Sequence, residues 1–126
     1  MHFAIRLALG KEFGYHLARM SFEIILSPEA VDDLRRLSAF ERAKVRDALE
    51  VHLRHEPAKV SKSRIKRLRE SNHPQYRLRV DDLRVFYDIE GNEVQVLAIV
   101  EKSDAADWLR EVGGCDEDGP AVGSEG

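Results

Sequence analysis

The chain has 126 residues, of which 43% are hydrophobic and 34% are charged, and its formal net charge is −3. This length suits a single domain with a modest core, and the composition is that of a globular chain. The single cysteine, Cys115, excludes an intramolecular disulfide and a cysteine metal cluster and favours a reducing compartment. No apolar run approaches the ~18–20 residues that cross a bilayer. We therefore expect a cytoplasmic protein without a membrane partner.

The charge is unevenly distributed along the chain. Residues 115–126 carry four acidic residues and no basic one, whereas residues 59–79 carry eight Lys or Arg against Glu70 alone. A basic patch of this kind indicates a polyanion or an acidic protein as partner. The acidic segment is rich in glycine and poor in bulky apolar residues, so we predict a disordered tail at 115–126.

A strand and a helix open the predicted domain. The apolar run "FEIIL" at residues 22–26 predicts a short strand. Ser27 followed by Pro28 is typical of an N-cap with proline at the first helical position, so a helix should begin there. Its apolar face holds Val31, Leu34 and Leu37, which makes the helix amphipathic.

A second helix should follow almost without a loop. Ser38 and Glu41, in "SAFE", form a capping-box pattern in which each side chain serves a backbone amide of the other residue. The helix should end near Pro57, because the residue before a proline disfavours the helical region. Its predicted core stripe is Phe40, Val45, Ala48, Leu49 and His52. So short a connection predicts an antiparallel helical hairpin.

Four segments of strand character follow the polar connector at 58–63. The first covers residues 65–69, and the next two are joined by a turn at Asp81 and Asp82 and alternate in polarity. One face of this pair holds Tyr76, Leu78, Val80, Leu83, Val85, Tyr87 and Ile89, and the other holds Gln75, Arg77, Arg79, Arg84, Phe86 and Asp88. After a turn at 90–92, residues 94–100 are apolar on both faces, which is typical of a central strand.

A last helix completes the predicted fold. Ser103 should cap it, Trp108, Leu109 and Val112 should form its apolar side, and the glycines at 113–114 should end it. The element order predicts an α+β domain, with the hairpin on one face of a four- to five-stranded, mainly antiparallel sheet. The first strand should lie beside the last strand. The other face of the sheet should stay open and carry the arginines.

Metal and covalent chemistry have little support. Of the histidines His2, His16, His52, His55 and His73, the pair His52 and His55 is close at helical spacing, but no zinc-protease motif accompanies it. The chain has no G-x-S-x-G elbow and no glycine-rich phosphate loop, and Cys115 lies in the tail. We therefore expect no metal and no cofactor.

The arginines of the strand pair are the main candidates for a functional surface. Arg77, Arg79 and Arg84 should project from adjacent strands on one face, where guanidinium groups can fork two donors onto phosphate oxygens. Phe86 lies between them and could stack on a base, a contact worth ~1–3 kcal/mol. Further basic candidates just upstream are Lys59, Lys62, Arg64, Lys66, Arg67 and Arg69.

The same pattern also fits a solvated face. Arg84 could pair with Asp88, and Arg77 and Arg79 could pair with Asp81 and Asp82, each pair worth under about 1 kcal/mol. Charge alone leaves both interpretations open.

The chain resembles toxins of the RelE/ParE superfamily, which are the toxin halves of type II toxin–antitoxin systems. The resemblance rests on "FEIILSPEAVDDLRRL" and on "YRLRVDDLRVFYDIEGNEVQVLAIVEKSDAADWL", and it covers residues 21–112. It implies a toxin domain at 20–114. Members usually begin just before the first strand, so Met20 is a plausible natural start, and residues 1–19 would be an extension that packs poorly.

The resemblance also implies roles for individual residues. RelE-like members cleave messenger RNA on the ribosome, and Arg77, Arg79 and Arg84 match their basic positions, with Arg84 at the position that stabilises the transition state. The further Arg and the Tyr or His that such nucleases carry after the last strand are absent from "EKSDAADWL". Lys102, Glu101 or Asp104 is a conceivable substitute acid–base group, and Lys102 is the candidate we name.

Three functions follow from the resemblance. The first is a toxin that inhibits translation by ribosome-dependent mRNA cleavage or by occupying the A site. The second is a ParE-like inhibitor of DNA gyrase, which needs no catalytic residue of its own. The third is a degenerate member that only binds an antitoxin and regulates its operon. In each case we expect a cognate antitoxin with an acidic C-terminal segment, which would cover the basic face.

Overall fold

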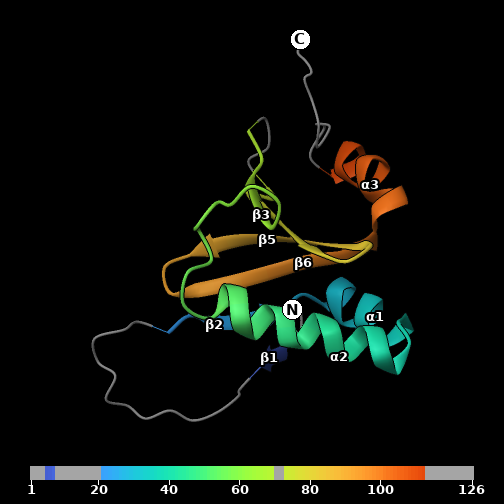
Figure 1. The fold of residues 1–126 in the computed structure, drawn as a ribbon, viewed down its shortest axis with the longest axis horizontal. Helices are drawn as coiled ribbons and strands as arrows, with labels where there is room; N and C mark the ends of the chain where they lie inside the picture. Colours follow the sequence, from blue (N-terminus) through green and yellow to red (C-terminus); the bar gives the residue numbers. More distant parts are fainter. Residues whose placement is uncertain (1–4, 8–20, 70–72, 113–126) are drawn as a thin grey trace.

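The computed structural model describes residues 5–7, 21–69 and 73–112, and of residues 5–7 the backbone alone. The elements in chain order are β1 (Ile5–Leu7), β2 (Glu23–Leu26), α1 (Pro28–Arg36), α2 (Ala39–Ala48), the π-helical turn η2 (Leu49–Leu53), β3 (Ile65–Arg67), β4 (Tyr76–Val80), β5 (Leu83–Glu90), β6 (Glu93–Glu101), the 3-10 turn η3 (Lys102–Asp104) and α3 (Ala105–Val112). They form one sheet with helices on both sides (Figure 1). No helix among the described residues is long and apolar enough to span a membrane.

The sheet order is β1-β2-β6-β5-β4-β3. β2 runs parallel to β6, and all other neighbouring strands are antiparallel. The α+β prediction is confirmed, as are the central place of the last strand and its pairing with the first strand of the domain. The five strands β2 to β6 agree with the predicted number, and β1 adds a sixth at the edge.

The predicted domain limits are only partly covered by the structure. β1 comes from the segment that we expected to pack poorly, and Ile5–Leu7 pair with β2. The start at Met20 stays a prediction. The predicted helix stop at 113–114 and the tail at 115–126 lie outside the described residues.

Both helices of the hairpin begin where the sequence signals place them. The hydroxyl of Ser27 accepts a hydrogen bond from the Ala30 N–H at 3.0 Å, and Pro28 occupies the first helical position. Ser38 and Glu41 form the capping box, in which the Ser38 Oγ accepts from the Glu41 N–H at 3.1 Å. Such caps satisfy amides that the helix itself leaves without acceptors.

The hairpin buries one face of the sheet (Figure 1). Val45, Leu49 and Leu53 are fully buried against the apolar side chains of the sheet. Phe40, predicted for the same stripe, is 70% exposed. At 100° per residue it lies about 140° around the helix from Val45, so that part of the prediction was wrong. His52 is half-buried, and Leu53 is the residue that completes the buried stripe.

The opposite face is partly covered by α3, whereas we expected it to be open. Phe86 is fully buried and stacks on Trp108 with ring centroids 4.8 Å apart. Leu68, Ala105 and Leu109 complete this second cluster. The apolar side of α3 must be buried against an apolar surface, and Phe86 and Leu68 provide that surface. Ser103 lies inside η3 and is not the cap of the helix.

A bulge in β6 moves its side chains from one face to the other. Phe86 pairs with Ala98 and Tyr87 pairs with Val96, so Leu97 is an extra residue. Before the bulge, Val96 joins the hairpin core; after it, Ile99 does, and Val100 packs on the α3 side.

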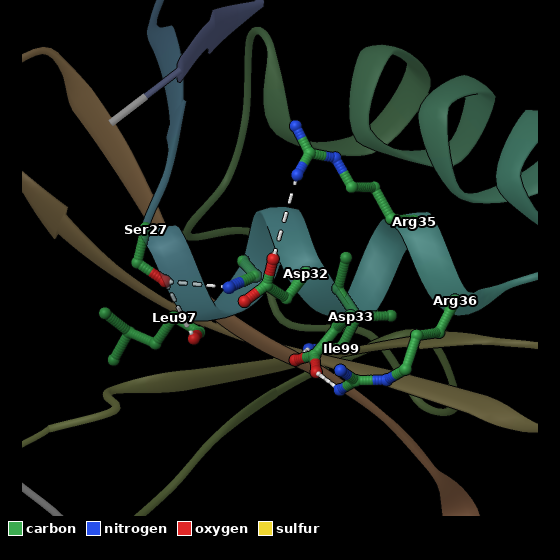
Figure 2. A network of polar contacts seen from close by, with 8 residues as sticks. Ser27, Asp32, Asp33, Arg35, Arg36, Leu97 and Ile99 are labelled. Carbon is green, nitrogen blue, oxygen red and sulfur yellow. Dashed lines mark hydrogen bonds and ion pairs between the residues drawn. The ribbon is translucent and has the colours of Figure 1, made fainter. Parts of the chain in front are cut away.

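The β2–β6 pairing ends at Leu26 and Val96, so β2 cannot bind the backbone of residues 97–99. Ser27 and helix α1 supply the hydrogen bonds there (Figure 2). Beyond the end of β2, the Ser27 Oγ donates to the Leu97 carbonyl at 3.0 Å, and the Ile99 N–H donates to Asp33 at 2.9 Å. Asp33 also accepts from Arg36 at 2.7 Å. Burial raises the pKa of Asp33, and the Ile99 N–H and Arg36 offset part of that effect. α1 therefore fixes the path of β6 toward η3.

Candidate nucleic-acid interface

Four basic side chains share the sheet face opposite the hairpin. Lys66 pairs with Arg77 across β3 and β4, Arg77 pairs with Phe86, and Arg79 pairs with Arg84 across β4 and β5. Residues directly opposite each other in an antiparallel pair project on the same side. We call Lys66, Arg77, Arg79 and Arg84 the cationic face.

Two of these arginines are direct cross-strand neighbours. Arg79 is exposed, and Arg84, opposite it, is half-buried. Arg84 Nη1 donates to the carbonyls of Asp81 and Leu83, each at 2.9 Å, so its guanidinium is held at the β4–β5 turn. Like charges placed opposite each other destabilise a strand pair. The arrangement therefore concentrates positive charge at one end of the cationic face.

Two of the three carboxylates in the solvated-face interpretation, those of Asp81 and Asp88, have other principal partners. Asp81 forms an ion pair with Lys44 of α2, and the pKa of Asp81 is lowered mainly by the Lys44 hydrogen bond and charge, with smaller effects of Arg64 and Arg79. Asp88 is bound by His73 and by the backbone of Gln75. The structure thus gives Asp81 and Asp88 partners other than the four residues of the cationic face.

Three of the predicted RNA-binding residues lie elsewhere or are covered. Arg67 pairs with Tyr76 and so projects on the hairpin side, where its guanidinium lies 5.2 Å from the centre of the Tyr76 ring. Arg67 also donates to the carbonyls of Leu68 and Gln75. Phe86 is fully buried under Trp108 and has no surface for a base. Arg69 is exposed but lies beyond the end of β3.

Lys102 lies near the Arg84 end of the cationic face. Its N–H donates to the Asp82 carbonyl at 2.8 Å, which fixes η3 against the β4–β5 turn. The side chain of Lys102 is exposed. Its role as an acid–base group stays a prediction.

Sequence reasoning missed a histidine and an aspartate that meet at the other end of this face. Asp88 is 7% exposed, and its carboxylate accepts from the Gln75 N–H and from His73 Nδ1, each at 2.7 Å. The His73 side chain is 71% exposed. The two residues are 15 positions apart, so no local spacing reveals the pair. The available sequence signal was an acidic residue, Asp88, in the middle of a mostly apolar strand.

A separate pocket lies beyond η2, on the side of the hairpin. It has a volume of about 280 Å³ and is lined by Val51, His52, His55, Glu56, Lys59, Ser61, Arg64 and Ile65. Burial and the neighbouring Arg64 lower the pKa of His52. The described residues bring no three His, Cys, Asp or Glu side chains together as a metal site.

Comparison with known proteins identifies the family. Residues 24–106 match the family described as the ParE toxin of the type II toxin–antitoxin system parDE. The chain belongs to this ParE toxin family. The resemblance to RelE/ParE toxins is thereby confirmed.

A solved structure agrees with the assignment at the level of the fold. The crystal structure of the RelB–RelE antitoxin–toxin complex from Methanococcus jannaschii contains a chain similar to this toxin, with a TM-score of 0.52 and 16% sequence identity. The match covers 67% of this chain and 96% of that chain. No curated protein matches the toxin.

Proposed function

We propose that this ParE-family toxin stops growth by engaging messenger RNA on the ribosome through the cationic face. The observation that supports this function is the placement of Arg79 opposite Arg84 on β4 and β5, with Arg77 and Lys66 beside them. Such a concentration of charge costs folding energy, and a polyanion would offset that cost. Phosphodiester groups suit the arginines because each guanidinium can fork two donors onto phosphate oxygens.

The toxin would be kept inactive by a cognate antitoxin with an acidic C-terminal segment. The solved complex that contains the similar chain joins the toxin RelE to the antitoxin RelB, which is the precedent for such a partner. An acidic segment would match the cationic face in charge, and complementary charge favours rapid and specific association. Because its targets are the ribosome and mRNA, the toxin would act in the cytoplasm.

A second candidate is inhibition of DNA gyrase, which the match to the ParE family favours. This function would need a binding surface but no catalytic group. Burial of Phe86 removes the predicted base-stacking residue, and that loss also weakens the case for RNA relative to a protein target.

Induction of the full chain in bacteria without antitoxin separates these functions. We expect protein synthesis to fall before DNA synthesis, and Arg79→Ala to relieve the arrest. Arg46→Ala is the matched control, because Arg46 is an exposed arginine on the hairpin side. Early loss of DNA supercoiling with intact translation would establish gyrase as the target. Growth without arrest would indicate an antitoxin-binding regulator.

A further inference from the structure

A buried carboxylate holds the exposed His73 in a fixed orientation. The Asp88 carboxylate accepts two hydrogen bonds of 2.7 Å, one from the Gln75 N–H and one from His73 Nδ1. Carboxylates only accept hydrogen bonds, so Nδ1 carries the hydrogen in this contact, and Nε2 of a neutral ring is left as an acceptor. The exposed imidazole can therefore take a proton at Nε2.

The pair lies on the same face as the cationic residues. Arg77 is opposite Phe86 in the β4–β5 pair, and Asp88 lies two residues beyond Phe86 along β5, on the same face. Arg77 is thus the diagonal neighbour of Asp88, and such positions are about 7–8 Å apart. A phosphate bound at Arg77 would lie within reach of a histidine held by Asp88.

We infer that His73 is the general base for RNA cleavage by this toxin and that Asp88 is the residue that positions it. The inference rests on the proposed function, and it supplies the acid–base group that the sequence lacks after β6. His73 Nε2 removes the proton of a ribose 2′-hydroxyl while the 2′-oxygen forms a bond to the adjacent phosphorus. The bond from phosphorus to the 5′-oxygen breaks, and that oxygen takes a proton from water. The products end in a 2′,3′-cyclic phosphate and a 5′-hydroxyl.

The charges on this face fit separate roles for Arg77, Asp88 and His73. Arg77 is the diagonal neighbour of Asp88 on this face, and it would stabilise the negative charge that develops on the phosphate oxygens. Asp88 would hold the His73 tautomer and stabilise the imidazolium, as the aspartate does in serine protease triads. A purely structural role for the pair, tying the start of β4 to β5, predicts no effect of His73 on the rate.

The decisive experiment measures single-turnover cleavage of a message on programmed ribosomes by the full chain. General bases contribute roughly 10²–10⁴-fold to rate, so His73→Ala and His73→Gln should each lose a factor in that range. Added imidazole should restore part of the His73→Ala rate. Asp88→Asn should slow cleavage strongly and should not respond to imidazole, because an amide donor to Nδ1 leaves the hydrogen on Nε2.

Controls separate chemistry from folding and binding. His55→Gln changes an exposed histidine near η2 and should keep the wild-type rate. The His73 variants should sediment with ribosomes like wild type. Undiminished cleavage by His73→Gln would overturn the inference and leave the proposed function intact. Absence of cleavage by the wild-type chain would overturn both RNA cleavage and the role of His73.

Discussion

The two faces of the sheet differ in how much apolar surface they bury. In the described part of the chain, fifteen buried apolar residues form the cluster under the hairpin, whereas four form the cluster under α3. The hairpin face therefore supplies most of the folding energy. The α3 face keeps room for the cationic face and for the pair of His73 and Asp88. Stability and the candidate function thus reside on opposite sides of one sheet.

The largest effect should come from the hairpin side. Leu49, the first residue of η2, is fully buried in the core against the sheet, and Leu49→Ala should lower the free energy of unfolding by about 2–5 kcal/mol, since the cavity can collapse only in part. Urea unfolding followed by circular dichroism measures the change. Phe40→Ala is the control, because Phe40 is exposed although it lies on α2, which leads directly into η2. Equal losses for both variants would contradict the assignment of the core.

A smaller effect is expected on the α3 side. Trp108 is half-buried over Phe86, so Trp108→Ala should cost less than the ~3–5 kcal/mol of a fully buried tryptophan. Because the cluster is small, α3 should open locally before the whole domain unfolds. Hydrogen exchange should then accelerate at residues 105–112 and stay unchanged in α2. Acceleration throughout the chain would show that the two faces unfold together.

These two sides also differ in how well the sequence predicts them. Ser27, Pro28 and the capping box of Ser38 and Glu41 act through adjacent residues, so the helix starts were predictable. Strand alternation placed Arg77, Arg79 and Arg84 correctly, and the same rule separates Arg67 from Lys66, which we had grouped together. The contact of Phe86 with Trp108 and the pairing of His73 with Asp88 depend on tertiary packing. Local patterns do not contain that information.

The bulge at Leu97 was hidden for a related reason. Residues 94–100 are apolar on both faces, so their sequence carries no alternation that could reveal a change of register. The sequence does carry one sign of the irregular strand: in α1, the acidic residue Asp33 occupies a position that faces the sheet. The role of this carboxylate becomes clear only from the structure, in which it accepts a hydrogen bond from the Ile99 N–H.

Asp33 should give an intermediate effect with a defined pH dependence. Asp33→Ala leaves the Ile99 N–H without this acceptor, a loss worth ~1–3 kcal/mol. Because burial raises the folded-state pKa of Asp33 above 3.8, the folded protein binds the proton first as pH falls. The stability of wild type relative to Asp33→Asn should therefore increase as pH falls through the folded-state pKa and level off below 3.8. Urea unfolding of both proteins across this range tests the sign, and a decrease would contradict it.

The smallest change should come from the cationic face, and its sign is informative. Arg79 faces Arg84 across β4 and β5, so Arg79→Gln should leave stability unchanged or raise it by up to ~0.5 kcal/mol. The gain should be larger at low ionic strength, where repulsion between exposed charges is less screened. Arg46→Gln on α2 controls for loss of one positive charge. A loss of stability above about 1 kcal/mol would mean that Arg79 is needed for the fold. The placement of Arg79 opposite Arg84 would then not indicate a binding surface.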